Sequence, residues 1–222
     1  MAELAGRGWS SARDGQQTTD VVLLRHADTK LTPERRFSGV GRGDPGLSET
    51  GRDQARRAAD SALLQGNRFT EVLSSPMTRC RETAQIVAAT LGVSVSVDPE
   101  LREMDFGLWE GMTFDEVQDR YPDDLRRWTQ SASAPPTGSS ETFAALLDRM
   151  GTVAERLASR YAGASVIAVT HVTPVKALVA QALGAPPAAL FRMELSSACF
   201  SRISYTGGEA SVRLLNDTSH LN

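Results

Sequence analysis

Two short apolar runs constrain the fold more than any other feature of this sequence. Residues 21–24 and 166–170 are rich in β-branched and aliphatic side chains, which is typical of buried strands in a parallel sheet. The first run is followed by Arg25 and His26, and the second by His171. Reactive groups gather beyond the carboxyl ends of such strands, so we expect the two histidines to share one crevice.

Strand and helix signals alternate along the rest of the chain, which predicts a three-layer α/β/α sandwich around a mostly parallel sheet. Ser48 is expected to cap the first helix, Pro76 to occupy the first position of the second, and Pro122 to interrupt the third. The expected strands are residues 21–24, 71–75, 93–97, 166–170, 196–205 and 210–215, the last two being antiparallel. The expected helices are residues 48–63, 76–91, 113–128, 141–161 and 174–184.

Composition indicates one globular domain. The chain has 222 residues, of which 41% are hydrophobic, enough to bury a sizeable core. Residues 1–19 lack periodicity and are interpreted as a flexible tail or linker, with the domain over residues 20–222. No apolar run resembles a signal peptide or a membrane span, so a cytoplasmic location without membrane contact is the default expectation.

Charge and cysteine content exclude several other classes of protein. The formal net charge is −3, so no global positive field attracts nucleic acid, and an anion must be held by a local cluster. Cys80 and Cys199 give neither a disulfide framework nor a zinc-binding spacing. We expect both to be reduced, buried thiols.

Arg25, His26 and Arg79 are candidates for phosphoryl chemistry. A guanidinium offers a planar fork of donors for phosphate, and a neutral imidazole can attack phosphorus. Arg79 is predicted in the first turn of a helix, where the helix dipole also favours an anion. Taken singly, each has a plainer explanation: a surface role for the Arg-His pair, and an ion pair with Glu82 or Glu103 for Arg79.

Glu103 lies among large apolar residues, which would raise its pKa and suit it to donate a proton. If the segment is extended, Asp105 shares its face and becomes a rival acid. The alternative for either carboxylate is a salt bridge to a nearby arginine. Arg35, Arg36 and Arg42 form a basic cluster that is either a solvated loop or the rim of an anion site.

Five segments resemble, in chain order, the histidine phosphatase (phosphoglycerate mutase-like) superfamily. The resemblance covers about residues 21–215. Within this superfamily the sequence resembles most the α-ribazole phosphatase-like branch, and especially the phosphatase half of actinobacterial proteins that fuse ribonuclease H to an acid phosphatase. Residues 213–221 support this narrower match. The five segments are residues 25–29, 47–55, 74–79, 101–111 and 170–171.

The resemblance implies an acid phosphatase-like phosphomonoesterase that works through a phosphohistidine, with α-ribazole phosphate as one candidate substrate and no metal or cofactor. His26 would be the nucleophile. Arg25, Arg79 and His171 would clamp the phosphoryl oxygens, with His171 more useful when protonated, and Glu103 would protonate the leaving oxygen.

Four further positions correspond to places where the family contacts phosphate or substrate, namely Ser38, Gly39, the backbone amide of Val172, and Thr32, which replaces a common asparagine. Ala27 stands where most members have glycine, which is expected to narrow the approach to phosphate slightly. Residues 106–145 are expected to form a cap over the site. Residues 1–19 would then be the remnant of a linker to a ribonuclease H domain, and a homodimer remains open.

Three rival interpretations remain. A cofactor-dependent phosphoglycerate mutase would use the same residues, although the short interval between Glu103 and His171 resembles the insert of the phosphatases. A non-catalytic phosphate-binding or interaction module would retain the fold alone. A doubly wound nucleotide-binding protein lacks its main support, because no glycine-rich phosphate loop follows any predicted strand.

Overall fold

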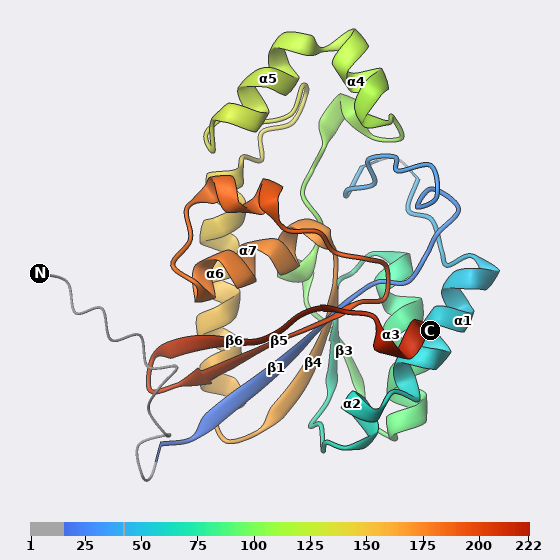
Figure 1. Ribbon diagram of the computed structural model, residues 1–222, viewed down its shortest axis with the longest axis vertical. Helices are drawn as coiled ribbons and strands as arrows, with labels where there is room; N and C mark the ends of the chain where they lie inside the picture. Colours follow the sequence, from blue (N-terminus) through green and yellow to red (C-terminus); the bar gives the residue numbers. More distant parts are fainter. Residues whose placement is uncertain (1–15, 42) are drawn as a thin grey trace, which may run out of the picture.

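A single mixed sheet forms the centre of the molecule (Figure 1). The computed structural model describes residues 16–41 and 43–222. In these residues the sheet has the strand order β3-β2-β4-β1-β5-β6. The strands are β1 (Thr18–Arg25), β2 (Val72–Ser74), β3 (Val95–Val97), β4 (Ser165–Thr170), β5 (Phe200–Thr206) and β6 (Glu209–Asp217).

The pairing of β1 with β4 determines where the chemistry lies. The two strands are parallel, and their register sets Arg25 opposite Thr170. The His26 amide donates to the Thr170 carbonyl over 2.9 Å, which extends the pairing by one residue. His26 and His171 therefore leave the sheet at the same edge. On its other side β1 pairs antiparallel with β5, which turns into β6 as predicted.

Helices cover both faces of the sheet, which confirms the three-layer prediction. Side chains of successive strand residues point to opposite faces. Val22 and Leu24 therefore pack against one helical layer, while Val21 and Leu23 pack against the other. The first layer contains α1 (Glu49–Ala59), α2 (Ala62–Gln65) and α3 (Thr78–Leu91), and the second contains α6 (Phe143–Arg160) and α7 (Val172–Ala182).

The segment between Phe106 and Phe143 rises above the carboxyl ends of the strands (Figure 1). It contains η3 (Gly107–Trp109), α4 (Phe114–Arg120) and α5 (Pro122–Gln130). Pro122 occupies the first turn of α5, as expected from its fixed backbone angle. The core of this segment is continuous with that of the α6–α7 layer, because Trp109 and Trp128 belong to the same apolar cluster.

The structure corrects two local predictions, for Pro76 and for the start of the first strand, and confirms a third, for Ser48. Pro76 does not open α3; the helix begins at Thr78 with Met77 as its N-cap. Ser48 does cap α1, accepting from the Gly51 amide. β1 begins at Thr18, so the last two residues of the predicted tail are part of the sheet. Residues 1–15 and Arg42 lie outside the described residues.

Two expectations from composition can be compared with the structure. Cys80 and Cys199 are free and buried, as predicted. Among the described residues no helix is long and apolar enough to cross a membrane.

Gly51 allows α1 to pack against the loop that follows β1. A Cβ atom at this position would lie 2.0 Å from the Asp28 carbonyl oxygen, which belongs to rigid backbone. We expect Gly51→Ala to lower the free energy of unfolding by about 1–3 kcal/mol in urea titrations, although alanine normally favours a helix. Gly151→Ala in α6 is the matched control. There a Cβ atom meets only the flexible Gln181 side chain, at 3.2 Å. Equal stabilities for the two variants would contradict this account.

Candidate active site

The two histidines meet at the carboxyl edge of the sheet, as the sequence predicted. His26 follows β1 and His171 follows β4, and their ring centroids are 5.2 Å apart in an edge-to-face arrangement. Both side chains are buried. Ser75 follows β2 at the same edge, so the strands β1, β2 and β4 each deliver one polar side chain to this site.

His26 is held in a defined tautomer. Its Nδ1 atom lies 2.9 Å from the Ala27 carbonyl oxygen. A carbonyl can only accept, so Nδ1 carries the proton and the Nε2 lone pair is free. Burial, followed by the charges of Arg79 and Arg25, lowers the pKa of His26 well below its ordinary value. The imidazole is therefore neutral, as a nucleophile at phosphorus must be.

His171 lies directly behind this nucleophile. Its Nε2 is 2.7 Å from the Ser75 hydroxyl and 3.4 Å from the Cys80 sulfur. Burial and the charge of Arg79 lower the pKa of His171 well below its ordinary value. Burial, and then the nearby guanidinium groups, therefore disfavour the protonated form of His171 in the protein alone. A bound phosphoryl dianion would raise the pKa of His171 and favour its protonated form.

Arg79 is fully buried in the first turn of α3. Its NH2 group donates to the Ser38 and Gly39 carbonyl oxygens, at 2.9 and 3.1 Å. Its carboxylate partner is Asp44, at 3.4 Å. The alternative of an ion pair with Glu82 or Glu103 is wrong; Glu82 pairs with Arg52 instead.

Glu110 fixes the loop that holds Arg79, and sequence reasoning missed it. Its carboxylate accepts from the Gly39 amide at 2.9 Å and from the Gly41 amide at 3.2 Å. In this structure the Gly39 amide thus donates to Glu110, and the Gly39 carbonyl oxygen accepts from Arg79. A side chain at Gly39 would meet the Met104 carbonyl oxygen at 2.2 Å, which explains the glycine.

Two guanidinium groups retain unused donors beside His26. Arg25 donates from NH1 to the Leu195 carbonyl oxygen at 2.6 Å. The Nε atoms of Arg25 and Arg79 are buried and have no hydrogen-bond partner in the described part of the chain. Unsatisfied buried donors are costly and rare, so this pair is typical of a site that receives an anion.

Glu103 has the properties of a proton donor. It is 4% exposed and accepts from the Met104 amide at 2.8 Å and the Thr173 amide at 3.3 Å. Burial raises its pKa, although both amides and Arg79 oppose the shift. Asp105 faces elsewhere, accepting from the Gly107 amide and the Ser139 hydroxyl, both at 2.9 Å. It does not line the cavity, which removes the geometric basis for a rival acid.

A cavity of about 510 Å³ opens above His26 and Glu103. Ser38, Thr32 and Val172 line it, whereas Arg79, His171 and Gly39 lie outside its lining. The Thr32 hydroxyl accepts from the Thr29 amide at 3.0 Å. Ala27 is not among the lining residues; it belongs to a small apolar cluster with Leu47, Ala55 and Ala198.

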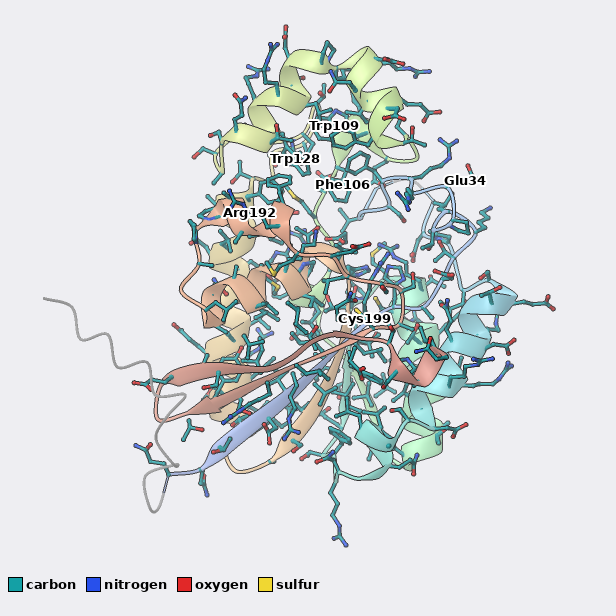
Figure 2. The ribbon with its side chains drawn as sticks, in the orientation of Figure 1. Glu34, Phe106, Trp109, Trp128, Arg192 and Cys199 are labelled. Carbon is teal, nitrogen blue, oxygen red and sulfur yellow. The ribbon has the colours of Figure 1, made fainter. Side chains whose placement is uncertain are left out.

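Aromatic rings form most of the upper wall of the cavity. Figure 2 shows Phe106 and Trp128 between the α4–α5 segment and the body of the molecule. Trp128 packs against Phe143 at 4.7 Å and against Phe191 at 5.3 Å between ring centroids. These residues are distant in sequence, so no local pattern predicted their convergence. The aromatic lining residues are Phe37, Phe106, Phe114, Trp128, Phe143 and Phe191.

Basic residues also line the cavity. Arg36 pairs with Glu34 and Glu116, while Arg35 is exposed at the mouth with a positive φ of 54°. Lys176, on α7, was not singled out from the sequence. It is the single charged residue within α7 and shares a helical face with Val172 and Thr173, a signal that could have found it.

A sequence model described as "Histidine phosphatase superfamily (branch 1)" matches residues 21–218. The chain belongs to this superfamily. Membership confirms the prediction of a histidine-type phosphatase fold and class of enzyme, which had been drawn from five short segments.

Individual relatives support the same assignment. The bifunctional protein Rv2228c of Mycobacterium tuberculosis is 42% identical over 215 residues, which cover 96% of this chain but 57% of that protein. Bacillus stearothermophilus YhfR is 29% identical with a TM-score of 0.83, covering 92% of this chain and all of that one. A putative α-ribazole-5′-phosphate phosphatase from Escherichia coli is 27% identical with a TM-score of 0.78, covering 90% and 96% of the two chains.

The tautomer and charge of His26 can be measured directly. Because Nδ1 donates to Ala27 and burial lowers the ring's pKa, we expect ¹⁵N chemical shifts at about pH 6 to show a neutral ring protonated at Nδ1. His26→Gln assigns the signals. A charged ring at that pH, or a neutral ring protonated at Nε2, would exclude this geometry.

Proposed function

We propose that the chain hydrolyses phosphomonoesters through a phosphohistidine intermediate on His26. The observation that carries the proposal is the His26 ring, whose Nδ1 is satisfied by Ala27 and which lies near two guanidinium groups whose buried Nε atoms have no partner in the described part of the chain. A nucleophile needs its lone pair free, and a phosphoryl group needs its negative charge stabilised. The site provides both.

In the first step, His26 Nε2 attacks phosphorus and the bond to the ester oxygen breaks. Arg25, Arg79 and His171 stabilise the three non-bridging oxygens, in the role of the charge clamps of other phosphoryl-transfer sites. Glu103, whose pKa is raised by burial, transfers its proton to the departing alkoxide.

In the second step, water attacks the phosphohistidine. Glu103, now a carboxylate, takes a proton from the water as its oxygen bonds to phosphorus. The P–N bond breaks, its electron pair returns to His26 Nε2, and phosphate departs. Glu103 is then protonated again, so the cycle closes without a further reactant.

The aromatic wall supports a leaving group that carries an apolar ring. Stacking on aromatic faces stabilises planar ligand groups, which small polyols cannot match. The α-ribazole phosphate suggested by the E. coli neighbour has such a ring, so it belongs in a phosphate-release screen with phosphorylated sugars, nucleotides and glycerates. Interconversion of phosphoglycerates without net phosphate release would instead favour a mutase.

The bifunctional relative supports a proposal about the whole protein. The chain spans about 57% of the length of that relative. We propose that this chain corresponds to the phosphatase part of such a two-part protein, with a ribonuclease H domain as the other part.

Removal of His26 should abolish turnover. We expect His26→Ala to release no phosphate and to form no phosphoenzyme, while wild-type protein traps an acid-labile phosphate on His26 after rapid quenching. Arg79→Ala and His171→Ala should each lower kcat/KM by about 10³-fold or more, and chelators should have little effect. His220→Ala is the control, because this third histidine stacks on Phe200, away from the cavity lining. Full activity of His26→Ala would remove the covalent mechanism.

Glu103 should govern the alkaline side of the pH profile. Burial raises the pKa of Glu103 and the proton donor must be protonated, so we expect kcat to fall as pH rises through that pKa. Glu103→Gln should lose about 10²–10⁴-fold in kcat and lose this alkaline limb. Asp105→Asn should keep the limb, since Asp105 faces away from the cavity. An unchanged limb in Glu103→Gln would assign the proton to another group.

A further inference from the structure

Lys176 brings an uncompensated positive charge to the wall of the cavity. It lies on α7, half-buried, one turn beyond Val172 and Thr173, and all three residues line the cavity. Side chains in a helix incline toward its N-terminus, so the Lys176 chain runs back toward the turn that binds Glu103.

No carboxylate in the described part of the chain forms an ion pair with this ammonium. In the described residues 16–41 and 43–222, Lys176 makes neither a hydrogen bond nor an ion pair. Burial of a charge without a partner is unfavourable, so such residues are rare unless a ligand completes them. The other basic residues that line the cavity differ from Lys176: Arg36 is paired with two glutamates, Arg35 is exposed, and Arg25 belongs to the proposed phosphoryl site.

The charged groups that face Lys176 leave the position open to an anion. They are Glu103, Arg25 and the exposed Glu194. Glu103 is the single acidic residue among those that line the cavity in the described structure, and burial raises its pKa, which favours the uncharged acid. Burial lowers the pKa of Lys176, because its ammonium group is poorly hydrated there. An anion beside Lys176 would stabilise the charged form.

We propose that Lys176 is a specificity-determining residue that binds a second anionic group, carried by the leaving group of the substrate. The reacting phosphoryl group already has Arg25 and Arg79. The aromatic wall offers contact to a ring, and Lys176 lines the same cavity as Glu103, Leu190 and Phe191. The substrate class is thus a phosphomonoester whose alcohol combines an apolar ring with a carboxylate or similar anion. This inference rests on the proposed phosphatase function.

A matched pair of substrates isolates the second anion. The probes are 4-carboxybenzyl phosphate and 4-methylbenzyl phosphate, together with the 3-substituted pair, which have the same reacting group and a similar ring. We expect wild-type protein to prefer the carboxylated member. Lys176→Met should lower the ratio of kcat/KM values by about tenfold, mainly through KM, as the loss of one partly buried charge pair implies.

Two control variants separate charge from packing. Lys176→Arg keeps the positive charge and should retain most of the preference. Arg192→Met removes an exposed cation from the neighbouring η4 (Pro187–Arg192), outside the cavity lining, and should leave the ratio unchanged (Figure 2). If Lys176→Met lowers kcat/KM equally for both substrates, Lys176 serves the reacting phosphoryl group and the proposal is overturned.

A binding measurement separates this inference from the proposed function. In the His26→Ala background, which needs no turnover, calorimetry should show tighter binding of the carboxylated phosphate, and Lys176→Met should remove that difference. If wild-type protein releases no phosphate but this binding difference persists, the proposed hydrolysis fails while the anion site stands. If the difference is absent in the His26→Ala background, the anion site fails whatever the activity.

Discussion

The buried guanidinium of Arg79 is the group around which the site is organised. A cation without solvent is stable only if acceptors surround it, and here they are the backbone carbonyls of Ser38 and Gly39 with the Asp44 carboxylate. These acceptors belong to a loop without regular structure. The loop keeps its place because Glu110 binds two of its amides. The position of one positive charge thus depends on three separate parts of the chain.

This arrangement also decides the state of both imidazoles. Two guanidinium groups and a dry environment lower the pKa values of His26 and His171, so neither ring adds a further positive charge. The same dry environment acts in the opposite sense on Glu103, because there the charged form is negative. One physical cause therefore shifts both groups toward their uncharged forms, which are the forms that the proposed nucleophile and proton donor require.

The strands and the positions of His26 and His171 were predictable, because apolar runs and the geometry of parallel sheets act over short distances. Arg79 was placed correctly in a first helical turn, although its partner was not, since Asp44 approaches through tertiary contacts. The charge state of His171 depends on burial, which cannot be read from neighbours in sequence. Glu110 and the aromatic wall were missed for a related reason, because their roles arise where distant segments meet.

The hydrogen bonds that the Gly39 and Gly41 amides donate to Glu110 constrain how such a protein can diverge. The segment above the cavity supplies the aromatic wall that would select the alcohol, yet it also supplies the carboxylate that holds the loop around Arg79. Exchange of this segment between relatives would therefore not be a modular change. A transplanted segment without an equivalent carboxylate would alter the grip on the phosphoryl group along with the choice of alcohol, so selectivity and chemistry are constrained to evolve together.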